Sequence, residues 1–219
     1  MSQWSVEGRA AAVDTMLSRA PILPVLAIER LADALPLARA LVDNGLPVLE
    51  ITLRSAIAMQ AIALLVRELP QACIGAGTVL DAQQLDAVAR SGAAFAIAPG
   101  STARLYAAAA AAPIPLIPAI ATASELMVGL EHGHRRFKFF PAAACGGVGA
   151  LKAFAGPFAG VRFCPTGGID AESAAEYLAQ PNVITVGGSW MAPSILVKAG
   201  DWAAIGRLAA GAARLRDIG

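Results

Sequence analysis

Eight short runs of apolar, β-branched or aromatic residues recur along the chain, separated by longer stretches rich in alanine and leucine. The short runs predict buried β-strands, and the longer stretches show the apolar spacing of helices. The predicted strands occupy residues 22–28, 47–52, 72–79, 94–99, 114–120, 136–140, 161–166 and 183–188. The predicted helices include residues 31–45, 55–69, 81–92, 101–112, 122–133, 170–180 and the last layer, 192–219. Strands therefore alternate with helices throughout.

Several predicted helices carry their own start and stop signals. The candidate N-caps are Asp81, Ser101, Thr122 and Asp170. The candidate C-terminal glycines are Gly45, Gly92 and Gly133. Thr122 is also followed three residues later by Glu125, the pattern of a capping box.

The alternation predicts the fold class. Strands this apolar are covered on both faces, which is typical of a parallel sheet wrapped by helices. Eight strand–helix units favour an α/β fold of the closed (β/α)8 (TIM) barrel type over an open sheet. Residues 4–19 predict an extra N-terminal helix that closes the bottom of the barrel. No linker or charge run divides the chain, so we expect a single domain over residues 1–219.

The composition favours a small-molecule partner. Of the 219 residues, 57% are hydrophobic and 15% are charged, with a formal net charge of +1. No block of like charges offers a footprint for nucleic acid or for an anionic membrane surface. The start of the chain lacks the pattern of a secretory signal, and charged residues interrupt every candidate membrane span. We therefore expect a soluble, cytoplasmic protein with no nucleic-acid or membrane partner.

The cysteines and histidines do not suggest a metal site. Cys73, Cys145 and Cys164 are widely spaced and odd in number, so we expect small core residues in a reducing compartment. His132 and His134 fall at a predicted helix end, on the side of the fold opposite the predicted site, and we expect a surface loop there.

Functional groups of a barrel lie at the carboxyl ends of the strands and in the loops that follow. Polar residues, glycines and one proline of this sequence gather at those positions. They are Glu50, Thr52, Arg54, Thr78, Pro99, Lys138, Thr166, Gly167, Gly168, Gly187, Gly188 and Ser189.

Lys138 is unusual because the chain has three lysines against fourteen arginines, and this one lies inside the aromatic run RFKFF. Strand alternation puts Lys138 on the face opposite Phe137 and Phe139. If that face is the barrel interior, desolvation favours the neutral amine, which can attack a ketone to form a Schiff base. The alternative is a lysine that reaches solvent from the strand end.

A carboxylate and a guanidinium occur at comparable positions of the second strand. Alternation places Glu50 on one face with Val48 and Thr52, where it can serve as a proton-transfer partner. The other interpretation is an ion pair of Glu50 with Arg54 or Lys138 that satisfies buried charge, and both can hold together. Arg54 lies just past the strand, where its guanidinium can bind a substrate carboxylate.

Glycine pairs follow the seventh and eighth predicted strands, in CPTGG and VGGSW. Barrels commonly bind phosphate at this place through backbone N–H groups. Two adjacent pairs, the second followed by Ser189, favour an anion site over two ordinary turns. The stretch GAGTV is not a dinucleotide fingerprint, because it lacks the third glycine at the required spacing.

The chain closely resembles the class I 2-keto-3-deoxy-6-phosphogluconate (KDPG) aldolases, which often also act on 4-hydroxy-2-oxoglutarate (KHG). The resemblance covers nearly the whole chain and rests on PVLAIER, VLEITLRS, GAGTVLDAQQL, FAIAPG, IPLIPAIATASELM, FKFFPA, FCPTGGI and VGGSWM. It implies a lyase of the Entner–Doudoroff pathway that releases pyruvate and glyceraldehyde 3-phosphate. It also implies no metal, no other cofactor and a homotrimer.

The resemblance further implies roles for individual residues. FKFFPA places the Schiff base on Lys138, and VLEITLR places the proton shuttle on Glu50 and carboxylate binding on Arg54. The residues implied to line the pyruvyl end are Thr78, Pro99 and Phe140. The residues implied to face the phosphorylated end are Thr166, Gly167, Gly168, Gly188 and Ser189. The chain departs from the pattern at Ala143 and Cys145, where relatives often carry Glu and Asn.

Three alternatives remain open at this point. An aldolase of the galactonate series would differ in its preference at C4 of the substrate. A sugar-phosphate isomerase or epimerase would use Glu50 as its base and the glycine pairs as its phosphate site. A non-catalytic barrel would bind a phosphorylated acid without cleaving it.

Overall fold

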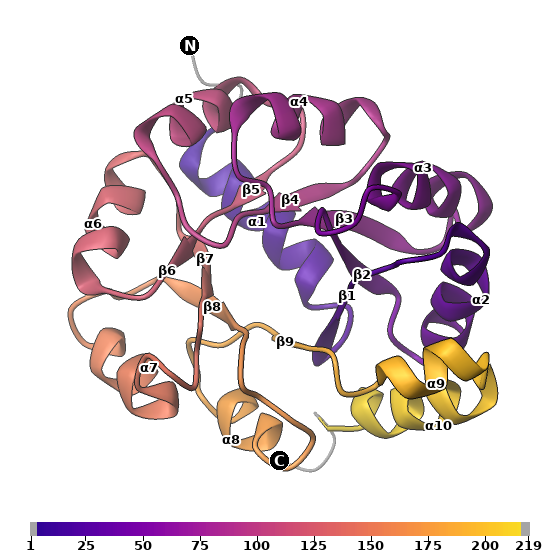
Figure 1. Cartoon of the computed structure of the whole chain (residues 1–219). Coiled ribbons are helices and arrows are strands. Elements are labelled where there is room, and N and C mark those ends of the chain that lie inside the picture. The colour runs from indigo at the N-terminus through magenta and orange to yellow at the C-terminus, as the bar shows by residue number, and fades with distance from the viewer. Residues whose placement is uncertain (1–3, 216–219) are drawn as a thin grey trace.

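The computed structural model describes residues 4–215, in which parallel strands alternate with helices (Figure 1). The strands are β1 Ile22–Leu26, β2 Val48–Thr52, β3 Cys73–Gly77, β4 Phe95–Ile97, β5 Leu116–Ile117, β6 Ala119–Ile120, β7 Arg136–Phe139, β8 Arg162–Pro165 and β9 Val186–Gly188. The helices are α1 Val6–Leu17, α2 Leu31–Val42, α3 Ala58–Glu68, α4 Ala82–Arg90, α5 Ala103–Ala111, α6 Ala123–Glu131, α7 Gly147–Ala155, α8 Ala174–Leu178, α9 Ser194–Ala199 and α10 Trp202–Ala213. Each of the eight predicted strand runs contains a strand, so that prediction is confirmed.

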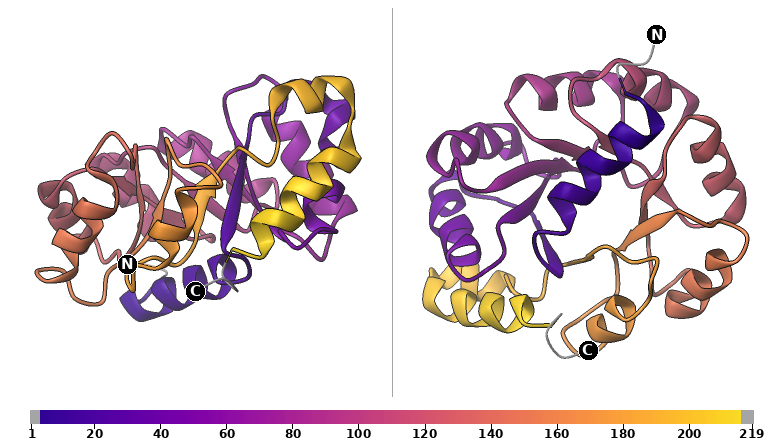
Figure 2. Two further views of the ribbon diagram at one scale, coloured as in Figure 1. Left: turned by 90° about the horizontal axis from the view of Figure 1, so that it is seen from below. Right: turned by 180° about the vertical axis from the view of Figure 1, so that it is seen from behind.

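The strands form two parallel sheets that curl around a common interior (Figures 1 and 2). One sheet has the order β5-β4-β3-β2-β1-β9 and the other the order β6-β7-β8. Single parallel bridges, Phe163 to Val183 and Thr166 to Gly187, connect the region of β8 to the region of β9. An α/β fold with parallel strands and helices outside them is therefore confirmed.

The fifth predicted strand is divided in two at Pro118. A proline has no N–H to donate to a neighbouring strand, so it interrupts a ladder of hydrogen bonds. Its carbonyl still accepts a bond of 2.9 Å from the N–H of Lys138, while Ala98 N–H donates to the carbonyl of Ile117 at 3.2 Å. The segment therefore passes from one sheet to the other at this residue.

The helix signals read from the sequence are largely confirmed. Asp81 and Thr122 accept the expected N-cap bonds, and Thr122 with Glu125 forms a complete capping box. The N-cap of α5 is Thr102 instead of Ser101, and α8 begins after Ser173 instead of Asp170. The glycines expected to end helices all have positive φ: Gly45 (95°), Gly92 (84°) and Gly133 (76°).

Apolar side chains form two separate layers. The larger one fills the space between strands and outer helices and includes Phe137 and Phe139. The smaller one lies inside the curled strands and contains Val48 and Phe95, together with Val13 and Leu17 of α1. Figure 2 shows α1 crossing the interior side of the strands at one end of the molecule. Strand alternation thus directs side chains to two different cores.

Within residues 4–215, no helix combines the length and the apolar character that crossing a bilayer requires.

The surface loop predicted at His134 is wrong, because this residue is buried. The residue is 1% exposed, and its ring packs against Tyr106 and Phe137 at centroid distances of 5.2 and 6.4 Å. Burial, and then the charges of Arg9 and His132, lower the pKa of His134 from 6.5 to about 3. The neighbours come from α1, α5 and β7, so no local pattern marks this burial. His132 is exposed, as expected.

We predict that His134 makes the protein less stable as the pH falls from 6.5 toward about 3. In that window the unfolded chain binds a proton on this imidazole while the folded chain does not, which removes about 1.4 kcal/mol of stability per pH unit. Urea unfolding across the window should show a shallower pH slope for His134→Leu than for the wild type. Equal slopes for the two proteins would contradict the prediction.

Candidate active site

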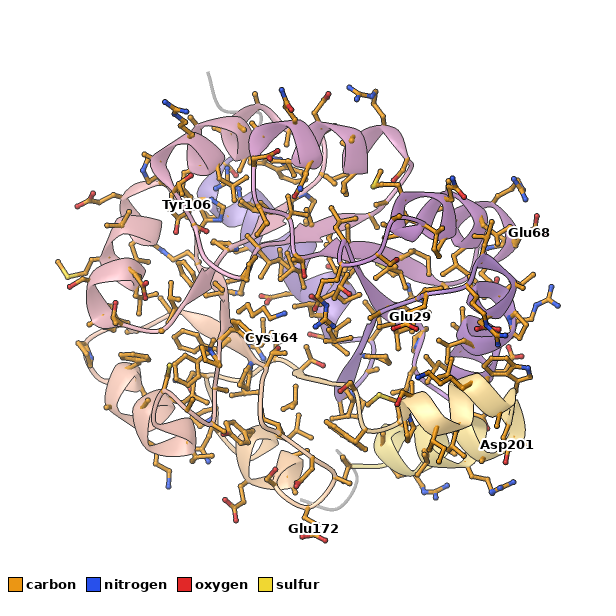
Figure 3. All side chains as sticks on the ribbon, in the orientation of Figure 1. Glu29, Glu68, Tyr106, Cys164, Glu172 and Asp201 are labelled. Atoms are coloured by element: carbon orange, nitrogen blue, oxygen red, sulfur yellow. The ribbon has the colours of Figure 1, made fainter. Side chains whose placement is uncertain are left out.

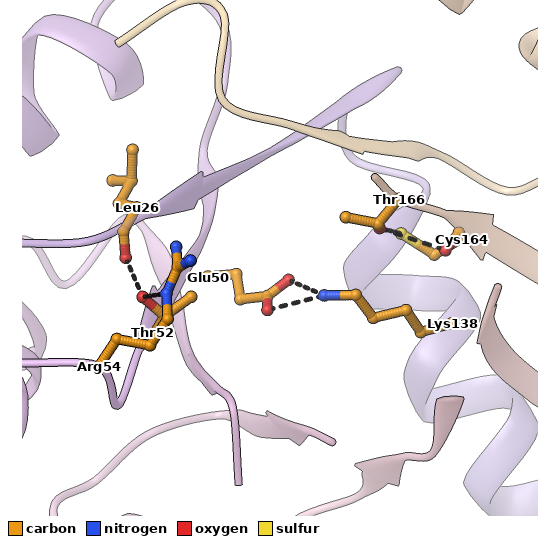
Figure 4. Close-up of polar contacts among 7 residues, drawn as sticks. All are labelled: Leu26, Glu50, Thr52, Arg54, Lys138, Cys164 and Thr166. Atoms are coloured by element: carbon orange, nitrogen blue, oxygen red, sulfur yellow. Dashed lines mark hydrogen bonds and ion pairs between the residues drawn. The ribbon is translucent and has the colours of Figure 1, made fainter. Parts of the chain in front are cut away.

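Lys138 and Glu50 meet in the interior of the curled strands. Lys138 Nζ, from β7, donates to Glu50 Oε1 at 3.0 Å and to Oε2 at 3.3 Å across from β2 (Figure 4). The two residues are 5% and 1% exposed. The ring of Phe140 lies 5.4 Å from Nζ. Lys138 therefore does not reach bulk solvent, and the structural ion pair considered from the sequence is present.

Glu50 occupies space that a glycine on the next strand leaves open. A Cβ atom on Gly77 of β3 would lie 2.0 Å from Glu50 Oε1 and 2.7 Å from its Cδ. Because heavy atoms cannot approach so closely, the carboxylate lies where the side chain of residue 77 would be. The same relation joins β8 to β9, where a Cβ on Gly187 would lie 2.2 Å from Thr166 Oγ1. No pattern around Gly77 in the sequence marks this role, because Glu50 lies on a different strand.

Arg54 is held by Thr52 at the carboxyl end of β2. Arg54 Nε donates to Thr52 Oγ1 at 3.1 Å, and Thr52 Oγ1 donates to the carbonyl of Leu26 at 2.9 Å (Figure 4). Within residues 4–215, no carboxylate lies within 4 Å of the Arg54 guanidinium, so Arg54 is not the ion-pair partner of Glu50.

Three further predicted residues are half-buried at strand carboxyl ends: Thr78 after β3, Pro99 after β4 and Phe140 after β7. Thr78 has φ of 60°, in the left-handed region that a β-branched residue rarely adopts. A backbone conformation of this kind costs about 1–3 kcal/mol, and residues that adopt it cluster at functional sites.

The glycine pairs follow β8 and end β9, as the sequence predicted. Gly167 and Gly168 have φ of 101° and 73°, so this turn requires glycine. Thr166 is 6% exposed, whereas Ser189 is exposed after Gly188. Ala143, one of the two departures from the family pattern, donates its N–H to the carbonyl of Gly167 at 3.0 Å.

A cavity of about 520 Å³ opens beside these residues and has both Arg54 and Ser189 in its wall. The rest of the wall comes from the end of β1, from α2 and from α9: Val25, Ala27, Ile28, Glu29, Arg30, Asp33, Leu37, Ala192, Pro193, Ser194, Val197 and Lys198. Figure 3 labels Glu29 on this side of the molecule. Lys138 and Glu50 are not part of the wall, so Arg54 and Ser189 are the predicted site residues that this cavity contacts.

The cysteine nearest the ion pair is chemically inert. Cys164 is 1% exposed, and burial raises the pKa of its thiol to about 12 (Figure 3). The thiol is therefore neutral at physiological pH and acts as a small packing group, as expected. Cys73 is also buried, while Cys145 is half-buried. The described part of the chain contains no group of three or more His, Cys, Asp or Glu side chains arranged to hold a metal ion.

The fold and the site define a class of protein. Enzymes that form imines with carbonyl substrates use a lysine amine that is removed from water. Here such an amine contacts a carboxylate near the strand ends of a parallel α/β fold, where enzymes of this fold have their active sites.

The sequence comparisons identify the family within that class. Residues 13–208 match the family described as KDPG and KHG aldolase. The chain is 50% identical over 204 residues to the 2-dehydro-3-deoxy-phosphogluconate aldolase of Pseudomonas aeruginosa, covering 93% of each protein. It is 50% identical over 196 residues to the KHG/KDPG aldolase of Escherichia coli K12, covering 90% of this chain and 92% of that protein. This chain belongs to the KDPG and KHG aldolase family.

A solved structure agrees with this assignment. The KDPG aldolase of Legionella pneumophila, solved with pyruvate captured at low pH as a covalent carbinolamine intermediate, is 48% identical to this chain. It matches with a TM-score of 0.90, over 91% of this chain and 97% of that one.

We predict that the ion pair between Lys138 and Glu50 contributes to the stability of the fold. Lys138→Met leaves the carboxylate of Glu50 buried without its partner, which should lower the free energy of unfolding by roughly 3–5 kcal/mol at neutral pH. Adding Glu50→Leu removes the unpaired buried charge and should restore much of the lost free energy of unfolding. Urea unfolding of the wild type, both single variants and the double variant measures this coupling. A double variant that is less stable than Lys138→Met would show that the prediction is wrong.

Proposed function

We propose that this chain is a class I aldolase that cleaves KDPG to pyruvate and glyceraldehyde 3-phosphate, and KHG to pyruvate and glyoxylate. The observation that carries the proposal is the Lys138 amine, buried and bonded to Glu50 at 3.0 Å. An imine on this lysine withdraws electrons from the bond to be broken, so the reaction needs neither a metal nor another cofactor.

The first half of the reaction forms the imine. Lys138 is ion-paired in the free site, so it must lose a proton before it can attack, and Glu50 lies where it can take that proton. The neutral amine adds to the C2 ketone and gives a carbinolamine. Glu50 then returns the proton, directly or through water, as the hydroxyl leaves as water and the iminium forms.

The second half breaks the carbon–carbon bond. Glu50, directly or through water, accepts the proton of the C4 hydroxyl while the C3–C4 bond breaks, and the electron pair moves into the iminium. Glyceraldehyde 3-phosphate leaves first, and the enamine of pyruvate remains on Lys138. Protonation at C3 and hydrolysis of the imine then release pyruvate and restore the amine.

The other predicted residues bind substrate in this proposal. Arg54 and Thr78 hold the pyruvyl carboxylate, while Pro99 and Phe140 line the pyruvyl pocket. Arg54 supports the first assignment, because its guanidinium lies in the cavity wall and has no carboxylate within 4 Å among the described residues. The residues that face the phosphorylated end are Thr166, Gly167, Gly168, Gly188 and Ser189. The positive φ of Gly167 and Gly168 supports a turn that exposes backbone N–H groups to an anion.

We also propose a closed (β/α)8 barrel as one domain, with β5 and β6 as the two halves of one strand and α1 closing the amino end. The bridges between β8 and β9 and the packing of Val13 and Leu17 in the interior support this arrangement. We further propose a homotrimeric and cytoplasmic enzyme. The trimer rests on the family resemblance, and the cytoplasmic location rests on the odd number and wide spacing of the cysteines.

Borohydride trapping tests the imine. We predict that reduction in the presence of pyruvate attaches a reduced pyruvyl group to Lys138 and to no other lysine, because this amine alone is paired with an interior carboxylate. Peptide mass spectrometry locates the modification, and Lys138→Ala should show neither trapping nor turnover.

Glu50→Gln should still bind substrate but turn over at least about a hundredfold more slowly, since its proton transfer is lost. Active enzyme with unmodified Lys138 would favour the isomerase alternative.

Substrate epimers test the stereochemical assignment. The related proteins named for phosphogluconate are about half identical to this chain, and we predict faster cleavage of the gluconate-series 6-phosphate than of its C4 epimer. Pyruvate release coupled to lactate dehydrogenase measures both rates. Preference for the epimer would support the galactonate-series alternative, and binding without pyruvate release would support a sensor.

A further inference from the structure

Thr52 links the substrate-facing arginine to the backbone of the first strand. Its Oγ1 lies 2.9 Å from the carbonyl oxygen of Leu26 and 3.1 Å from Nε of Arg54 (Figure 4). Thr52 is 2% exposed, so its bond to Leu26 is shielded from water, whereas the Arg54 side chain is exposed. The three groups therefore form a short chain of hydrogen bonds from β1, through β2, to the wall of the cavity.

The direction of both hydrogen bonds follows from the single proton on the Thr52 hydroxyl. A carbonyl oxygen can only accept, so the single hydroxyl proton of Thr52 is donated to Leu26. The oxygen of Thr52 then has only lone pairs left, and the Nε–H of Arg54 is a donor that fits them. The arrangement has no alternative proton placement that keeps both bonds.

The bond to Nε leaves the binding end of Arg54 available. A guanidinium is planar, so a bond at Nε fixes the plane and restricts rotation of the side chain. Among the described residues, Thr52 is the one hydrogen-bond partner of Arg54. The two terminal nitrogens of Arg54 have no carboxylate within 4 Å in this part of the chain. Those nitrogens provide the paired donors that a planar carboxylate accepts bidentately.

We propose that Thr52 is a positioning residue that orients Arg54 for the carboxylate of a 2-oxo acid. This inference rests on the proposed function, because it takes Arg54 as the carboxylate-binding group. Thr52 itself touches no reacting atom. A β-branched threonine suits the role because its χ1 is restricted and its hydroxyl is held in one direction.

The test compares Thr52→Val with Thr52→Ser. Valine keeps the shape of threonine and removes the hydroxyl, whereas serine keeps the hydroxyl. The pyruvate concentration that half-saturates borohydride trapping on Lys138, and KM for KDPG, should rise about tenfold in Thr52→Val, because a hydrogen bond to a charged group is lost. The value of kcat should change much less, and Thr52→Ser should restore most of the affinity.

Two other hydroxyls of the chain provide matched controls. Thr185 is 1% exposed and donates to the carbonyls of Ala20 and Pro21 just before β1, and no arginine within residues 4–215 bonds to it. Ser55 adjoins Arg54 in sequence and donates to the carbonyl of Ile28 at 2.6 Å. Thr185→Val and Ser55→Ala therefore lose a hydroxyl-to-backbone bond near β1 without losing a partner of Arg54. Both should keep the half-saturating pyruvate concentration of the wild type, whatever their loss in urea stability.

Experiments with the variant Arg54→Gln distinguish a failure of the proposed role of Thr52 from a failure of the proposed function. If Thr52 acts through Arg54, adding Thr52→Val to Arg54→Gln should raise the half-saturating pyruvate concentration no further. Wild-type enzyme that traps no pyruvate on Lys138 would refute the proposed function itself. Normal trapping, with an affinity loss in Arg54→Gln but none in Thr52→Val, would overturn only the role of Thr52. An equal loss in Thr52→Val and Thr185→Val would also overturn it.

Discussion

The buried contact between Lys138 and Glu50 is the constraint on which the rest of the site depends. Taking two charges out of water costs several kcal/mol per ion, and their attraction offsets this cost only when the geometry is good. Here both carboxylate oxygens lie within 3.3 Å of one ammonium group. The two residues come from strands of different sheets, 88 positions apart in the chain. Both sheets must therefore be folded before the pair exists.

The interior accommodates polar side chains because neighbouring strands supply glycine. Gly77 leaves room for the carboxylate of Glu50, and Gly187 leaves room for Thr166. One layer nearer the amino end, the space of Gly75 is filled by the ring of Phe95. Small and large residues thus alternate between adjacent strands, which is how a tightly packed interior is filled. A substitution at such a glycine acts on the neighbouring strand's side chain as much as on its own backbone.

Stability and chemistry are separated between the two ends of the strands. At the amino end, α1 covers the interior, and its Asp14 binds Arg136 of β7 through a bond of 2.6 Å. His134 is buried at that end as well, without contact with the cavity. At the carboxyl end, Arg54 and Ser189 lie in loops that follow strands and form part of the cavity wall, while Glu50 and Lys138 project from the strands themselves. The same separation is typical of parallel α/β enzymes.

Features that depend on near neighbours in the chain were determined by the sequence alone. The alternation of Phe137, Lys138 and Phe139 between two faces and the capping box at Thr122 are local properties, because one or two turns of backbone set them. For the same reason the carboxyl-end positions of the site residues could be read from the strand boundaries. The family motifs then assigned chemistry to those positions.

Only the tertiary structure decided the contacts and the burial that depend on segments remote from one another in the chain. It decided that Glu50 bonds Lys138 and not Arg54, that Thr52 reaches Leu26, and that His134 is buried. It also decided that Pro118 marks the passage from one sheet to the other. These outcomes follow from which side chains meet when distant strands pack, and a pattern confined to one strand or one helix carries no information about that meeting.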